Sequence, residues 1–125
     1  MKQNINEIEI NGVVYVRKDA INSQSLAVNT DGLQCVIIRT RSAGVHFGFL
    51  KSRNGLEVEL INSRRVYYWD GAASLSQMAV DGVSEPKNCK FTVVVPTITL
   101  TEAIEVIPVT TQAQTNLFAV PVWKR

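Results

Sequence analysis

Arginine and aromatic side chains gather in two short segments of this 125-residue chain. The segment 39–50 combines arginines with small residues and a histidine, and the segment 64–75 begins with two arginines and three aromatic residues. Guanidinium groups bind phosphate through paired hydrogen bonds, and aromatic rings stack on bases. This combination is typical of a nucleotide site. The residues that we expect to contact such a ligand are Arg39, Ser42, Gly44, His46, Arg64, Arg65, Tyr67, Tyr68, Trp69 and Ser74.

These candidates fall into a few chemical roles. The arginines would hold phosphate groups, the aromatic rings would stack on a base, and His46 with Ser42 would hydrogen-bond to sugar or base edges. Gly44 would let a ligand approach the backbone closely. Ser74 stands where a short helix should begin, and the free N–H groups of a helix N-terminus attract anions.

The same residue types permit two other interpretations. A strand with an aromatic core face and a solvated basic face would have this composition. An oligomer interface would also be rich in Tyr, Trp and Arg. A pocket at a subunit interface would combine the ligand site with the interface, so the sequence leaves all three open.

The sequence gives little support to catalysis. His46 is the single histidine, and no nucleophile elbow, phosphate-binding Gly-rich loop or metal-ligand cluster is present. Cys35 and Cys89 are too few and too distant for a disulfide framework, and we expect them to behave as small hydrophobic residues. We therefore expect a binding protein without a cofactor, and not an enzyme.

Charge and hydropathy narrow the class of partner. The net charge of +2 is low for a general DNA-binding protein, whereas the local cluster of arginines suits a small anionic partner. No apolar run approaches the ~20 residues that span a membrane, and the first residues lack the apolar core of a signal peptide. We expect a cytoplasmic protein that does not contact membranes.

The elements that would position these residues are mostly strands. Alternating apolar residues around Asn11-Gly12 predict a β-hairpin over 7–17, followed by a polar linker. The rest predicts an α+β fold, with an antiparallel β-sheet meander and one or two short helices. The domain division is therefore a hairpin appendage with its linker over 1–32 and a core domain over 33–125. Expected strands are 34–40, 45–50, 56–60, 65–69, 91–95, 97–100 and 103–109; expected helices are 74–80, with Ser74 and Gln77 as a capping box, and 111–118.

The two segments carry a recognisable pattern. It runs Arg39-Thr40-Arg41-Ser42-Ala43-Gly44-Val45-His46 to Leu50, then Arg64-Arg65-Val66-Tyr67-Tyr68-Trp69-Asp70-Gly71-Ala72-Ala73-Ser74-Leu75. From about Gln34 onward the chain resembles a family of small proteins of tailed bacteriophages and prophages that share a domain of unknown function. Arg41 stands where that family commonly has an aromatic residue, and Ser63 where alanine is common. The hairpin resembles a small module attached to many phage proteins.

The resemblance implies a phage origin and a location in the host bacterial cytoplasm, and it implies no particular activity. We expect a non-catalytic, homo-oligomeric counter-defence protein that sequesters a nucleotide immune signal, such as a cyclic nucleotide or an ADP-ribose-type molecule. The alternatives are a virion structural or assembly protein, and a protein inhibitor of a host factor.

Overall fold

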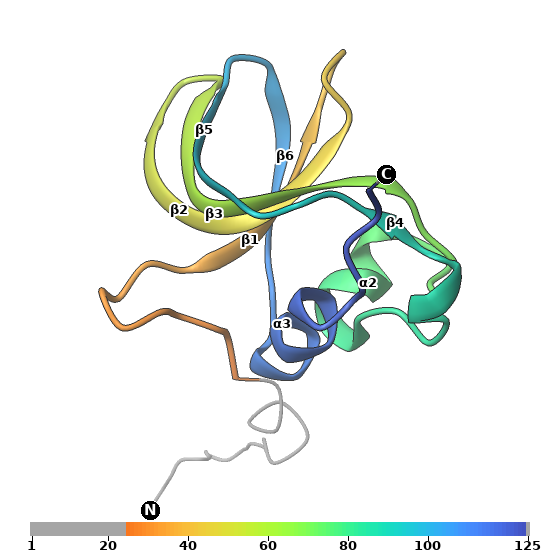
Figure 1. Ribbon diagram of the computed structural model, residues 1–125. Coiled ribbons are helices and arrows are strands. Elements are labelled where there is room, and N and C mark those ends of the chain that lie inside the picture. Colours follow the sequence, from red (N-terminus) through yellow and green to blue (C-terminus); the bar gives the residue numbers. More distant parts are fainter. Residues whose placement is uncertain (1–24, 125) are drawn as a thin grey trace, which may run out of the picture.

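One antiparallel sheet and two short helices make up the described part of the chain, residues 25–124 of this computed structural model (Figure 1). The hairpin expected over 7–17 lies outside those residues. The α+β expectation is confirmed for the sheet and the helices. The strands are β1 (Cys35–Thr40), β2 (Val45–Asn54), β3 (Glu57–Tyr68), β4 (Lys90–Phe91), β5 (Val95–Leu100) and β6 (Ala103–Pro108); the helices are α2 (Leu75–Asp81), the 3₁₀ turn Pro86–Asn88 and α3 (Thr111–Phe118).

The sheet begins as the expected meander and then curls. Strands β1, β2 and β3 pair in chain order, and β6 pairs with β1 on the outer side. Strand β5 pairs with the first half of β3, and β4 pairs with its second half. Strands β5 and β6 lie at opposite ends of the sheet although only Thr101 and Glu102 connect them, so the sheet bends strongly upon itself (Figure 1).

Each face of this curled sheet has its own hydrophobic core. Cys35, Ile37 and Phe47 point toward α2 and α3 and pack with Met78 and Leu117. Their neighbours point into the curl, in a cluster made of Val36, Ile38, Val58, Leu60, Leu100 and Ala103. Because successive strand residues face opposite sides, burial on both faces explains why residues 35–38 form a continuous apolar run.

Three segments differ from the sequence-based expectation. The strand expected over 91–95 is not continuous, because β4 ends at Phe91 and β5 begins at Val95. The separately expected strands 56–60 and 65–69 are the single strand β3, which continues through Asn62 at a φ of 52°. Asparagine tolerates this left-handed conformation better than most residues. Ala27, in the segment expected to be linker, packs on the domain: it is 2% exposed, and its N–H donates to the Val109 carbonyl at 2.9 Å.

The two cysteines are buried and free, in agreement with their expected role as small hydrophobic residues. Burial raises the pKa of the Cys35 thiol to about 12. Within residues 25–124 no helix is long and apolar enough to cross a membrane.

Candidate functional site

A cavity of about 630 Å³ lies where the end of β1, the start of β2 and the start of α2 meet. Five of the ten expected ligand-contacting residues line it, namely Arg39, Ser42, Gly44, Trp69 and Ser74. We call it the Arg39 cavity. Its other lining residues are Thr40, Arg41, Val45, Leu75, Ser76 and Glu105. Arg39 follows Ile37 of the helix-side core by two positions in β1, so both side chains lie on the same face of the sheet. The cavity is therefore on the helix side of the sheet.

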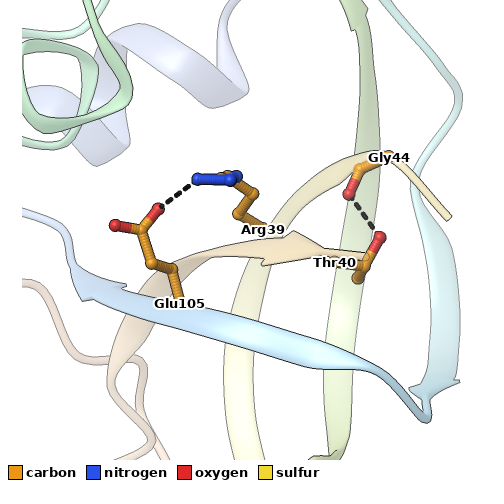
Figure 2. A network of polar contacts seen from close by, with 4 residues as sticks. All are labelled: Arg39, Thr40, Gly44 and Glu105. Carbon is orange, nitrogen blue, oxygen red and sulfur yellow. Dashed lines mark hydrogen bonds and ion pairs between the residues drawn. The ribbon is translucent and has the colours of Figure 1, made fainter. Parts of the chain in front are cut away.

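The β1–β2 turn is held by a nearly buried threonine. The Thr40 hydroxyl donates to the Gly44 carbonyl at 2.7 Å (Figure 2) and accepts from the Ala43 N–H at 2.8 Å. Gly44 has a φ of 84°, a conformation that glycine adopts at little cost. These contacts fix the turn that carries Arg41, Ser42 and Gly44 along the cavity.

The charges around the Arg39 cavity are mixed. Arg39 and Glu105 are partners in the β1–β6 register, and their side chains form an ion pair at 3.6 Å (Figure 2). Both are half exposed, so the pair contributes little to stability, ~1 kcal/mol at most, and an incoming anion can replace the carboxylate. Ser42 donates to Glu102, whereas Arg41 forms no ion pair within the described residues.

Trp69 and the start of α2 form the opposite wall. The Trp69 Nε1–H donates to the Ala72 carbonyl at 3.1 Å, and the indole packs partly against the helix-side core, which fixes its orientation. Ser74 caps the helix as expected, since its hydroxyl accepts from the Gln77 N–H at 3.1 Å and Gln77 Oε1 accepts from the Ala73 N–H at 2.8 Å. Capping thus occupies the Ser74 hydroxyl and those two N–H groups.

His46 and Arg65 lie on the opposite face of the sheet. They line a smaller cavity of about 220 Å³ together with Ser63, Thr92, Val93, Val95 and Ile98. We call it the Ser63 cavity. His46 Nε2 donates to the Ala43 carbonyl at 2.8 Å. Burial lowers the pKa of His46 and the Arg65 charge lowers it further, while the Ala43 carbonyl raises it; burial is the largest cause and favours the neutral ring.

Arg64 faces neither cavity and has a structural role. Its side chain is 2% exposed, and its guanidinium lies 5.4 Å from the centre of the Phe91 ring. Burial lowers the pKa of Arg64. All three guanidinium nitrogens donate to backbone carbonyls, which include those of Thr92 at 2.8 Å and Val120 at 2.9 Å. The guanidinium therefore anchors the C-terminal segment and does not present a phosphate site.

Tyr67 and Tyr68 are exposed and line neither cavity. Tyr67 stacks on Trp123 with ring centroids 4.8 Å apart, and Lys90 Nζ lies 5.5 Å from the centre of the Trp123 ring. Of the three aromatic neighbours at 67–69, Tyr67 thus stacks on Trp123 at the surface, Tyr68 is exposed outside that stack, and Trp69 forms a cavity wall.

Four polar residues that line the cavities were not expected there from the sequence: Arg41, Ser76 and Glu105 in the Arg39 cavity, and Ser63 in the smaller one. Arg41 departs from the family pattern, so that pattern gives no signal for it. Glu105 comes to the site through the pairing of β6 with β1, which no local signal in the sequence reveals. Within the part of the chain that the structure describes, no group of three or more His, Cys, Asp or Glu side chains could hold a metal ion.

Comparison with known families assigns the chain to a family. The model of a domain of unknown function, DUF6948, matches residues 33–117, and the chain therefore belongs to this family. No curated protein and no solved structure matches the chain.

Proposed function

We propose that this protein is a non-catalytic binding protein whose Arg39 cavity takes a nucleotide-type small molecule, with an anionic phosphate and a flat ring. The observation that carries the proposal is the placement of Arg39, Arg41 and Trp69 around one hollow of about 630 Å³. Ligand cavities of roughly 300–1,000 Å³ are usual for small molecules. The elements that build this hollow are held by the Thr40 turn and the Ser74 cap.

Each lining group has a place in binding such a ligand. Arg41 has no acidic partner within the described residues and offers its guanidinium to a phosphate. Arg39 would exchange the exposed Glu105 carboxylate for a phosphate oxygen, at a small cost. The Trp69 ring would stack on the base, and the Ser76 hydroxyl would bond to polar groups of the ligand.

Binding is favoured over catalysis by the titratable groups of the cavity. These are two guanidinium groups, which donate hydrogen bonds and accept none, and Glu105, which is ion-paired to one of them. His46, the one histidine of the sequence, lies in the other cavity. Ser42 donates to the Glu102 carboxylate, but Glu102 does not line the Arg39 cavity, so no lining group is itself placed as a general base next to a nucleophile.

The biological role that we propose is counter-defence. A phage protein that binds a nucleotide immune signal in the host cytoplasm, without transforming it, lowers the free concentration of that signal. This role depends on the resemblance to phage proteins and on the proposed binding of phosphate in the Arg39 cavity. A homo-oligomer would carry one such site in each of its subunits.

A protein-contact role is the second candidate, as a virion or assembly component or as an inhibitor of a host factor. The surface stack favours it, because Tyr67 is 64% exposed and Trp123 is 45% exposed. Aromatic residues of this kind are enriched at protein interfaces. Mass spectrometry of purified particles should find the protein if it is a virion component, and its absence there would exclude that role.

The binding proposal is tested by isothermal titration of the full chain with cyclic dinucleotides, cyclic trinucleotides and ADP-ribose derivatives. We expect at least one to bind with a Kd below ~100 μM, and to be recovered unchanged after long incubation. The absence of such binding across the panel would contradict the proposal. Turnover of the bound ligand would contradict its non-catalytic part.

A further inference from the structure

The Ser63 cavity contains a buried polar atom without a partner. Ser63 is 1% exposed, and its Oγ has no hydrogen-bond partner within the described residues. Buried hydroxyls are nearly always hydrogen-bonded, because an unsatisfied one is destabilising. A group bound in the cavity would supply the missing partner.

Next to this hydroxyl lies a cation without a counter-charge. The ion pairs of the described residues are Arg39–Glu105 and Lys51–Glu59, so Arg65 has no carboxylate partner there. The pKa of His46 is lowered by burial, which favours a neutral ring and leaves Arg65 as the positive charge of the cavity.

The other walls of the Ser63 cavity are apolar or already engaged. Thr92 Oγ1 accepts from the Arg65 N–H at 2.9 Å and is placed to donate to the Val93 carbonyl at 3.2 Å. Val93, Val95 and Ile98 complete the lining. The polar groups left for a ligand are the Ser63 hydroxyl, the Arg65 guanidinium and the second ring nitrogen of His46, beside an aliphatic wall.

We propose that the Ser63 cavity is a second ligand site, which takes a short aliphatic carboxylate. The carboxylate would accept hydrogen bonds from Ser63 Oγ and the Arg65 guanidinium, and the hydrocarbon part would pack on Val93, Val95 and Ile98. The cavity of about 220 Å³ has room for roughly seven non-hydrogen groups, since one water occupies about 30 Å³ of liquid. It is too small for a nucleotide, so this site is independent of the Arg39 cavity and its proposed ligand.

The test uses the single histidine as a reporter on the cavity wall. We would titrate the full chain with isovalerate at constant pH and follow the imidazole signals of His46 by NMR. We expect a saturable change. Ser63→Ala and Arg65→Gln should each weaken binding by roughly tenfold, the loss expected for a hydrogen bond or an ion pair to a charged group. Arg53→Gln, which removes an exposed arginine that lines neither cavity, is the control and should leave the affinity unchanged.

Three results would overturn the proposal. The first is the absence of any saturable change at His46, which would mean that water alone satisfies Ser63. The second is an affinity of Ser63→Ala equal to that of the unaltered protein; this variant should fold normally, because the hydroxyl bonds to nothing in the described residues. The third is inorganic phosphate binding more tightly than isovalerate, which would show that the aliphatic wall has no part in recognition.

Discussion

Arg64 and Arg65 are neighbours in β3, yet one is buried beneath the sheet and the other is exposed. The Arg64 guanidinium donates to backbone carbonyls of the C-terminal segment and of Phe91 and Thr92. Arg64→Ala leaves these carbonyls unsatisfied and opens a cavity, so we expect the free energy of unfolding to fall by about 3 kcal/mol or more. Arg65→Ala is the matched control and should change it by less than ~0.5 kcal/mol. Urea denaturation measures both, and equal losses would contradict the structural role of Arg64.

His46 should make stability depend on pH. Its pKa is lowered in the folded protein, whereas the unfolded chain titrates near ~6.5, so below that pH the unfolded state binds the proton more readily. The contribution of neutral His46 to the free energy of unfolding is fully present above pH ~6.5, and it decreases as the pH falls toward the lowered folded-state pKa. We expect the free energy of unfolding to decrease between pH 7.5 and 5.5 by a larger amount in the unaltered protein than in His46→Gln. The same decrease in both proteins would assign the pH dependence to other groups.

At the scale of elements, Gly82 ends helix α2 and lets the following segment pack against α3. It has a φ of 77°, and a Cβ at this position would lie 2.3 Å from Asn116 Oδ1. That side chain of α3 accepts from the Val83 N–H at 2.8 Å and donates to the Val83 carbonyl at 3.0 Å. Any larger residue at position 82 must disrupt this clamp between the two helical segments.

Gly82→Ala should therefore cost more than the same change at Gly55. Gly55 has a φ of 62° in the β2–β3 turn, and a Cβ there meets nothing within 4 Å. We expect a loss of about 1 kcal/mol for Gly55→Ala, from backbone conformation alone, and at least twice as much for Gly82→Ala. Thermal unfolding of the two variants compares them directly. Equal losses would mean that the Asn116 clamp contributes nothing.

Local signals predicted the elements well where the chemistry is local. Ser74 and Gln77 are only three positions apart, and this pair correctly marked the start of α2; the strand expected over 45–50 likewise lies within β2. The left-handed Asn62 inside β3 could not be foreseen, because the sequence around it looks like a break between two strands. The return of β6 to pair with β1 depends on the curl of the whole sheet.

The candidate site was predicted only in part, because some of its residues are brought together by long-range strand pairing and not by local sequence. Arg39, Ser42, Gly44, Trp69 and Ser74 meet in one cavity because the β1–β2 turn and the start of α2 lie on the same side of the sheet. His46 and Arg65 lie across the sheet, and the face of Arg65 depends on a register that the bulge in β3 shifts. The residue types predicted anion-binding chemistry, but they did not predict that the expected residues are divided between cavities on opposite faces of the sheet.

At the scale of the whole molecule, the fold extends beyond the matched family segment 33–117 on both sides. Ala27 is buried and bonds to Val109 and Cys35, and the carbonyl of Val120 accepts from Arg64. We expect a chain of residues 33–117 to unfold at a much lower temperature than a chain of residues 25–125, because it lacks both contacts. Circular dichroism during heating compares them. Equal midpoints would show that the flanking segments are dispensable.

The central claim is that the Arg39 cavity binds an anionic small molecule through the guanidinium groups on its rim. The most direct measurement compares Arg41→Gln with Arg53→Gln by titration with the tightest-binding nucleotide of the panel. Both variants remove one exposed arginine, but Arg53 lies at the far end of β2 and lines neither cavity. We predict that Arg41→Gln weakens binding by roughly tenfold or more and that Arg53→Gln leaves it within about twofold. Equal affinities of the two variants would contradict the assignment of this cavity as the binding site.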